Sequence, residues 1–328
     1  MTRTLRLLLA LVAATLTLTA ARAQTDALLT QYFEVPSYYN PAATGTTDML
    51  RIRGASRLQW VGIDNAPRTF LALAESPFNL AGKRLGAGLW VRQERLGLYD
   101  DLSLALQVSY KIRLAGGTLS IGVQPGVITE KFRGSEVFIP DDDNYHEETD
   151  EAIPRSDMSG TAFDLGAGVH YTRRGFYAAL SCTHLTQPTV SFSSETSSST
   201  EAVSVFEFTA RRTLFFTAGG NIRLRNPLFE VMPSMLLASD FTFTTVQATL
   251  RMRVKSLFSF GVAYRHNDAV SLLLGAEYRQ FFLGYSFDYP TTEIARASHG
   301  SHEIVAGYSL RLDLSGQNRF KQKSIRIL

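Results

Sequence analysis

From about residue 48 onwards, apolar and polar residues alternate along most of the chain with a period of two. Between residues 102 and 113, for example, every second residue is a large apolar one, and the intervening residues are small, polar or charged. Successive side chains of a β-strand point to opposite faces, so this pattern predicts strands with one apolar and one polar face. Two further segments show it clearly, at 246–255 and 281–289.

Two fold classes fit such strands, a soluble sandwich and a membrane barrel. The alternating segments run to about 10–15 residues, longer than the usual strand of about 5–6 residues, and tilted strands of this length cross a bilayer. The apolar faces end in Trp60, Tyr110, Tyr171 and Tyr289, as in the aromatic girdles of such barrels. No apolar run long enough for a transmembrane helix follows the first 23 residues. We therefore predict an all-β transmembrane antiparallel barrel.

Glycine recurs on the polar face of the predicted strands, where it eases curvature and close packing of material inside the barrel. These glycines are Gly86, Gly88, Gly122, Gly126, Gly166, Gly168 and Gly284.

The pattern gives about fourteen strands, with ends uncertain by a few residues. They are 48–60, 67–76, 83–94, 99–114, 117–132, 161–173, 175–185, 206–225, 229–239, 242–254, 257–267, 269–279, 281–289 and 302–313. The long loops 133–160, 186–205 and 290–301 all fall on one side, and tight turns fall on the other. An even strand number and this asymmetry predict that both termini are periplasmic in a bacterial outer membrane.

The first 23 residues have the features of a secretory signal peptide. Arg3 and Arg6 precede an apolar stretch, and Ala21-Arg22-Ala23 fits a cleavage site that leaves Gln24 first. Cleavage removes three of the 33 basic side chains and none of the 30 acidic ones, so the mature chain has no net charge and no global field for nucleic acid. The predicted organisation is a signal peptide at 1–23, an N-terminal periplasmic or plug segment at 24–47, the barrel at 48–313 and a basic tail at 314–328.

Few segments suggest catalysis or metal binding. The acidic loop 141–151 suits calcium in charge but lacks the EF-hand spacing, so a solvated loop is favoured. His299 and His302 share a loop without an evident third ligand, and Cys182 lies on an apolar strand face. The motifs Gly-x-Ser-x-Gly and His-Glu-x-x-His are absent, although a Ser/His pair brought together by the fold remains open. We predict no cofactor, no metal and no enzymatic activity.

Basic residues recur on the polar face, notably Arg51, Arg53 and Arg57 on the first strand and Arg251 and Arg253 later. The favoured interpretation is a network of salt bridges inside a wet lumen, or charges at the periplasmic end of the barrel. An anion-selective channel or a docking surface is the alternative. On the lipid side we predict Leu104, Leu106, Val108, Leu250, Met252, Leu283 and Phe287. Arginine at Leu106 should therefore destabilise far more than arginine at its neighbour Gln107.

Several local motifs are not explained by the alternation expected of barrel strands. In chain order they are Gln31-Tyr32-Phe33, Pro36-Ser37-Tyr38-Tyr39-Asn40-Pro41-Ala42-Ala43-Thr44-Gly45, Arg57-Leu58-Gln59-Trp60-Val61-Gly62, Ala66-Pro67-Arg68-Thr69, Leu119-Ser120-Ile121-Gly122, Tyr285-Ser286-Phe287-Asp288-Tyr289, Ser301-His302-Glu303-Ile304 and Gly307-Tyr308. In this order and spacing the chain resembles the PorP/SprF family of the type IX secretion system of Bacteroidota, over essentially its whole mature length. The NPAxxG and QWxG…APxT motifs are the more specific ones.

The resemblance implies a non-enzymatic outer-membrane barrel that takes part in protein secretion and, in gliding bacteria, in gliding motility through delivery of surface adhesins. It also implies partners, namely periplasmic ring or lipoprotein components and a secreted adhesin or cargo protein. Candidate motif or partner-contact residues are Tyr38, Asn40, Pro41, Gly45, Arg57, Gln59, Trp60, Pro67, His302 and Glu303. A general diffusion porin or hydrophobic-solute channel is the alternative function.

The same motif residues have structural interpretations, and we favour fold maintenance over direct partner contact. Asn40-Pro41 followed by Gly45 is turn chemistry just before the first strand, Pro67 suits a strand start, and Trp60 suits an outer girdle. Residues 24–47 are rich in aromatics, poor in charge and too short to fold alone. They must pack in the lumen as a plug, at the periplasmic rim, or on a periplasmic protein.

Overall fold

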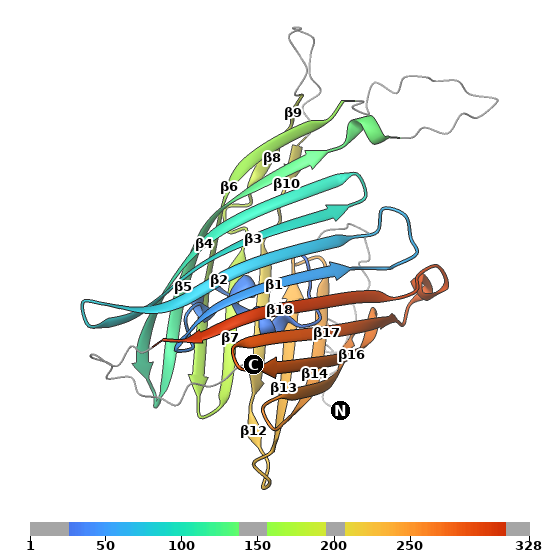
Figure 1. Cartoon of the computed structure of the whole chain (residues 1–328). Coiled ribbons are helices and arrows are strands. Elements are labelled where there is room, and N and C mark those ends of the chain that lie inside the picture. Colours follow the sequence, from blue (N-terminus) through green and yellow to red (C-terminus); the bar gives the residue numbers. More distant parts are fainter. Residues whose placement is uncertain (1–25, 138–155, 195–206, 313–328) are drawn as a thin grey trace, which may run out of the picture.

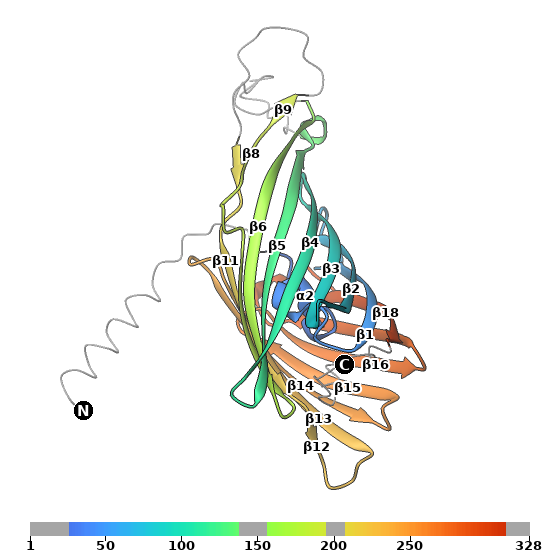
Figure 2. The same cartoon turned by 90° about the vertical axis from the view of Figure 1, so that its left-hand side faces the viewer.

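The computed structural model describes residues 26–137, 156–194 and 207–312. Fourteen antiparallel strands form a closed barrel in which each strand pairs with its neighbours in the chain and the last pairs with the first (Figures 1 and 2). The barrel strands are β1 (Met49–Leu58), β2 (Arg68–Leu80), β3 (Lys83–Leu96), β4 (Tyr99–Leu114), β5 (Gly117–Phe132), β6 (Met158–Arg173), β7 (Phe176–Thr183), β11 (Thr213–Gly220), β13 (Phe229–Ser239), β14 (Thr244–Val254), β15 (Phe258–Arg265), β16 (Ala269–Tyr278), β17 (Phe281–Pro290) and β18 (Ser301–Arg311). The fold class predicted from the alternation is confirmed.

The apolar faces point outwards. Along β4, Leu104, Leu106 and Val108 are 39%, 56% and 48% exposed, whereas the intervening Ser103, Gln107 and Ser109 are buried. Leu250, Met252 and Leu283 are exposed as well, and Phe287 is half-buried on the same outward side. An exposed apolar band around a closed barrel is the surface that hydrocarbon covers.

The two rims of the barrel differ in their connections. At one rim, called here the turn rim, the hairpins Ala81-Gly82, Ala115-Gly116 and Arg174-Gly175 have positive φ at both residues, as in two-residue hairpin turns. The opposite rim, the loop rim, carries the described residues 59–67, 133–137, 156–157, 184–194, 207–212 and 291–300. Because Met49 pairs with Arg311, the barrel begins and ends at the turn rim. Which side of the membrane each rim faces stays a prediction.

The strand predicted over 206–225 is wrong in its extent. Glu207–Thr209 (β10) pairs with Thr189–Ser191 (β8) in a separate two-stranded sheet, and barrel pairing starts only at Thr213. The short strand β12 (Ile222–Arg223) continues along β13 after a break at Asn221, and β9 (Ser193–Ser194) pairs with β6. A continuous run of strand-forming residues does not reveal where the pairing partner changes.

The N-terminal segment lies inside the barrel (Figure 2). It contains three short helices, η1 (Tyr32–Glu34), α2 (Pro36–Tyr39) and η2 (Pro41–Ala43). Two further short helices, η3 (Gly134–Glu136) and η4 (Glu293–Arg296), belong to loops at the loop rim. Among the described residues, no helix is both long and apolar enough to cross a membrane. We call residues 26–47 the luminal plug.

The hydrophobic core is therefore formed between the luminal plug and the inner wall. Tyr32, Phe33, Tyr38 and Tyr39 pack on one another and on inward-facing wall residues, with Tyr38 against Trp90 and Tyr39 against Phe215. The lumen at this level is filled by protein.

Candidate functional site: the luminal plug and its anchors

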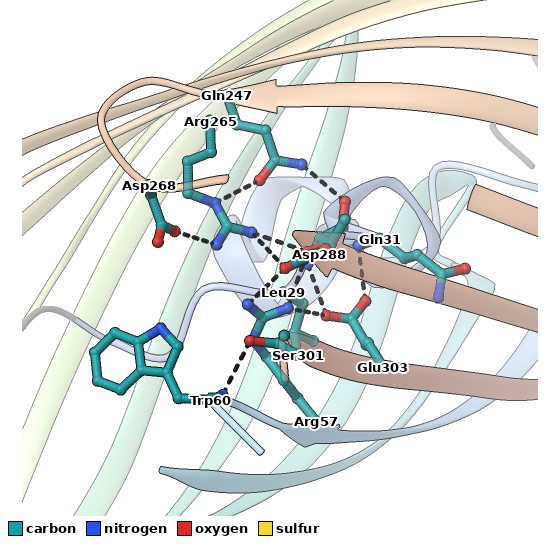
Figure 3. A network of polar contacts seen from close by, with 12 residues as sticks. Leu29, Gln31, Arg57, Trp60, Gln247, Arg265, Asp268, Asp288, Ser301 and Glu303 are labelled. Carbon is teal, nitrogen blue, oxygen red and sulfur yellow. Dashed lines mark hydrogen bonds and ion pairs between the residues drawn. The ribbon is translucent and has the colours of Figure 1, made fainter. Parts of the chain in front are cut away.

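An ionic cluster holds the start of the luminal plug to the wall (Figure 3). The Arg57 guanidinium donates to Asp288 at 2.7 Å and to Glu303 at 3.1 Å, so β1, β17 and β18 converge on one charge centre. The backbone N–H groups of Thr30 and Gln31 donate to the two oxygens of the Glu303 carboxylate at 2.7 and 2.8 Å. Both carboxylates are buried and each has a cation, as buried charges require.

Arg265 on β15 extends this cluster along the wall, two strands beyond β17. Its guanidinium donates to the Thr30 hydroxyl at 2.9 Å, to the side-chain oxygen of Gln247 at 3.0 Å and to Asp268 at 2.7 Å. The Gln247 amide in turn donates to the Thr30 carbonyl at 2.9 Å. Thr30 is thus held from five strands that are distant in the sequence.

A second anchor holds Asp26, the first described residue, in the half of the lumen nearer the loop rim. Its carboxylate accepts from Arg92 at 2.9 Å and from the Thr183 hydroxyl at 2.9 Å, and it contacts His184 Nε2 at 3.0 Å. The other ring nitrogen of His184 lies 3.0 Å from Asp164. His184 therefore bridges two carboxylates, one on the plug and one on the wall.

These contacts shift the ionisation of both partners. Burial would raise the pKa of Asp26, but the charges and hydrogen bonds of His184 and Arg92 together hold that pKa well below its usual range. Burial would lower the pKa of His184, but Asp26 and Asp164 raise it to about 10. The imidazolium and the Asp26 carboxylate are therefore both charged at neutral pH.

The turn-rim half of the lumen binds the plug through arginines. The Glu34 carboxylate lies 3.4 Å from Arg251 and 3.8 Å from Arg53, and its backbone carbonyl accepts from Arg51 at 2.9 Å. The Arg251 guanidinium also stacks over the Phe33 ring, 3.3 Å from its centroid. Arg51 pairs with Glu75 on the wall, and Arg253 pairs with Glu230. The predicted interior salt-bridge network is confirmed for these arginines.

Inward-facing glycines form the shelf under η2. A Cβ on Gly122 would collide with the backbone of Pro41 and Ala42, and one on Gly168 would collide with the Asn40 side chain. Gly86 meets the Thr44 carbonyl in the same way. The close packing predicted for the polar-face glycines is confirmed at these positions, because only hydrogen leaves room for the plug backbone.

The structure brings the plug motif and the wall motifs together. The Asn40 side chain caps η2 by accepting from Ala42 N, and it donates to the carbonyls of Val169 and Leu180. Tyr38 is buried, and its hydroxyl accepts from Arg92 at 3.0 Å. Gly45 has a φ of 61° and packs against Pro77 and Gly86. Within the described chain, Tyr38, Asn40, Pro41 and Gly45 make intramolecular contacts.

The remaining motif residues lie at the loop rim or on the outer surface. Trp60 N donates to the Ser301 hydroxyl, and Gln59 N donates to the Pro67 carbonyl, which closes the β1–β2 loop. His302 points outwards and bonds to the Tyr285 hydroxyl at 2.8 Å, away from Glu303, its neighbour in sequence. His299 lies near the Val61 carbonyl instead, so the two histidines have separate partners.

The sequence did not predict several of the residues that hold the plug in place. Asp26, Thr30, Arg92 and His184 received no role, although all four fix the plug. The inward glycines were the available signal, because three of them mark where the plug backbone lies. The acidic loop 141–151 and the basic tail 314–328 lie outside the described residues. Among the residues that the structure describes, no group of three or more His, Cys, Asp or Glu side chains is arranged to hold a metal ion.

The geometry defines a class: an outer-membrane β-barrel whose lumen is filled by its own N-terminal segment. The sequence profile described as "type IX secretion system membrane protein PorP/SprF" matches residues 21–308, and the chain belongs to that family. No curated protein sequence matches the chain.

Solved structures similar to this chain have low sequence identity to it. The toluene transporter TbuX of Ralstonia pickettii is 11% identical, with a TM-score of 0.49 over 85% of this chain and 94% of that one. Omp33 of Acinetobacter baumannii is 7% identical, with a TM-score of 0.44 over 82% and 100%. The toluene transporter TodX of P. putida is 10% identical, with a TM-score of 0.44 over 83% and 92%.

Proposed function

We propose that this protein serves type IX secretion as a non-enzymatic docking barrel, which binds periplasmic components, secreted cargo, or both at its rims. The observation that carries the proposal is the luminal plug, which motif residues of the family hold in place. The motif residues Arg57 and Glu303 form hydrogen bonds with Thr30 and Gln31 of the plug, so their partners lie within the chain. We therefore assign partner binding to the rims.

The filled lumen argues against the alternative of a general diffusion porin. Buried ion pairs and aromatic packing hold the plug on every side, and its removal would take Glu34 away from Arg251 and Asp26 away from Arg92 and His184. Leaving such charges unpaired is costly, so we expect no steady open pore.

We also propose that the turn rim faces the periplasm, because short turns on the periplasmic side and long loops outside are the general pattern of such barrels. The basic tail then provides a periplasmic contact for an acidic partner, and the loop rim is left to cargo. Tyr38, a candidate contact residue in the sequence, is buried and makes a poor probe of this arrangement.

Site-specific photocrosslinking tests both proposals. A probe at Lys255, exposed in the β14–β15 turn, should crosslink to periplasmic ring or lipoprotein components. A matched probe at Asp64, exposed in the β1–β2 loop, should capture secreted cargo or nothing. Periplasmic partners captured at Asp64 alone would overturn the orientation. Deletion of the gene without loss of any secreted surface protein would overturn the secretion role.

A further inference from the structure

The exposed charges of the two rims differ in sign. At the turn rim, every connection between barrel strands has an exposed basic residue in the turn or within two residues of it, and the end of β18 has one as well. We call these residues the basic ring: Lys83, Arg113, Arg173, Arg174, Arg223, Arg225, Lys255, Arg279 and Arg311. The exposed acidic residues in the described part of the chain all lie at the loop rim, and they are Asp64, Glu136, Glu207 and Glu293.

The acidic residues that do occur near the turn rim are not exposed. Among the described residues they are Asp48, Glu230 and Glu277, all half-buried. Asp48 pairs with the buried Arg84, and Glu230 pairs with the buried Arg253. Most of this negative charge is therefore directed to buried arginines, and the exposed surface of the turn rim is positive.

Three members of the basic ring lie on the lipid side of the barrel. The Lys83 ammonium group lies 5.6 Å from the centroid of the Tyr110 ring, and the Arg279 guanidinium lies 5.4 Å from that of Tyr278. Both tyrosines are exposed on the outer surface, and Arg173 lies on the outward side of β6. Since Tyr and Trp on the outside of a membrane protein lie at the level of the lipid headgroups, these three cations lie at that level too.

The distribution of the basic ring fits lipid better than a docked protein. A protein that docks at a rim contacts one sector of it, whereas a bilayer surrounds a barrel on all sides. The basic ring has members at all turn-rim connections from β2–β3 to β16–β17 and at the end of β18. Anionic lipids attract Lys and Arg side chains that lie near the membrane surface.

We propose that the basic ring binds the phosphate groups of anionic phospholipids in the leaflet around the turn rim. Lys83, Arg173 and Arg279 contact the phosphates directly, because ammonium and guanidinium groups form charge-assisted hydrogen bonds with phosphate oxygens. The choice of phospholipid over the phosphates of lipopolysaccharide rests on the proposed periplasmic orientation of the turn rim. The binding of lipid phosphate itself is independent of the proposed role in secretion.

Electron paramagnetic resonance of spin-labelled lipids measures this binding on the folded mature protein in phosphatidylcholine vesicles. We expect labelled phosphatidylglycerol to associate with the barrel about threefold more strongly than labelled phosphatidylcholine at low salt, as an average over the perimeter. In about 1 M salt the preference should largely disappear, because salt screens exposed charges. Equal association of the two lipids at low salt would overturn the proposal.

A pair of charge-matched variants tests the residues. Lys83→Gln/Arg173→Gln/Arg279→Gln, the ring variant, should lose at least about half of the preference. Arg211→Gln/Arg212→Gln/Arg296→Gln removes the same charge from exposed residues of the loop rim and should keep it. Gel mobility of unboiled samples shows whether both variants fold. An equal loss of the preference in the two would assign it to the net charge of the protein and would overturn the proposal.

Mass spectrometry of the lipids retained by protein purified from outer membranes distinguishes the sources of phosphate. The ring variant should retain less anionic phospholipid than the unchanged protein. A loss of lipopolysaccharide in its place would overturn the choice of phospholipid and the proposed orientation with it. A loss of a bound protein with unchanged lipid would assign the basic ring to a protein partner, against the proposal. None of these measurements depends on secretion, so their failure leaves the proposed function untouched.

Discussion

At the scale of single residues, the luminal plug is held by a few buried charges whose partners come from distant parts of the chain. Arg57 is the clearest case, because it neutralises Asp288 and Glu303 at once while both carboxylates accept from the plug. The free energy that depends on Arg57 is therefore larger than that of a surface ion pair.

Arg57→Met should lower the free energy of unfolding by about 3–5 kcal/mol, because it leaves Glu303 buried without a cation and Asp288 with only Arg265, 3.7 Å away. Arg95→Met is the control: Arg95 is 54% exposed in its pair with Asp100, and its loss should cost less than about 1 kcal/mol. Urea unfolding in lipid vesicles, followed by the gel mobility of unboiled samples, measures both. Equal costs for the two variants would show that the Arg57 cluster does not hold the plug.

The Asp26–His184 contact should weaken at high pH. The pKa of His184 is raised to about 10 by Asp26 and Asp164, and the nearby Arg92 stays charged. A raised pKa contributes stability that is fully present below about pH 6.5 and is lost as the pH rises through about 10. Amide exchange over residues 28–31, corrected for its intrinsic pH dependence, should therefore speed up from pH 7 to pH 10.

His184→Gln separates this titration from that of other groups in the same range, including the α-ammonium group. The variant should show faster exchange at pH 7 and a much flatter pH dependence. An unchanged pH dependence in His184→Gln would assign the effect to another group.

Whether a site residue can be predicted from the sequence depends on how far it lies along the chain from its partner. Arg57, Asn40 and Glu303 were named because they stand in recognisable motifs. Which residues pair was not predicted, since Thr30 and Asp288, for example, are 258 positions apart, and nothing local pairs them. Ion pairs across a closed lumen depend on strand register and on where the plug lies, which the alternation of residues does not encode.

At the scale of elements, the period-two alternation predicted most strand bounds, because one apolar face per strand fixes both position and register. It failed at residues 206–212, where strand-forming residues continue but the pairing partner changes from β8 to the barrel. It also left the place of residues 24–47 open among three sites, and the structure shows residues 26–47 inside the lumen.

The comparison of Leu106 with Gln107 needs correction at this scale. The expectation of a low cost at Gln107 assumed a wet lumen, but its side chain is buried and donates to the Ser37 carbonyl of the plug at 2.6 Å. Arginine there would disturb the plug, so this pair of variants does not isolate the lipid contact.

Leu106→Arg and Leu114→Arg form the better pair, since both residues are exposed on the outer face of β4. Leu106 lies in the middle of the strand and should cost about 2–4 kcal/mol, whereas Leu114 ends the strand at the turn rim and should cost about 0–1 kcal/mol. Unfolding in vesicles measures the difference. A higher cost for Leu114→Arg than for Leu106→Arg would mean that the hydrocarbon layer surrounds the turn rim and not the middle of β4.

Gly122→Ala should displace η2 from its shelf. Its new Cβ collides with the backbone of Pro41 and Ala42, and overpacking of this kind costs about 1–3 kcal/mol. Gly54→Ala is the control, because a Cβ there comes no closer than 4.0 Å to its nearest neighbour. Amide exchange over residues 40–45 should speed up in Gly122→Ala only. Equal exchange in the two variants would mean that the plug does not rest on Gly122.

At the scale of the whole molecule, the plug divides the lumen by charge. Arginines and Lys111 dominate the inner wall toward the turn rim, and carboxylates dominate it toward the loop rim. The plug complements this division at one end, since Glu34 lies among arginines; at the other end Asp26 lies near carboxylates and pairs with Arg92 and His184. A lumen that is closed and paired in this way suits a protein that acts through its rims, which is the role proposed for it in type IX secretion.

The conductance of the intact mature protein in a planar bilayer tests the central claim most directly, provided that its gel mobility shows a folded barrel. If residues 26–47 fill the lumen, the inserted protein should give no steady open-channel current at neutral pH. A steady, ohmic current from the intact protein would contradict the account, because it would require a water-filled path through a lumen that the plug occupies.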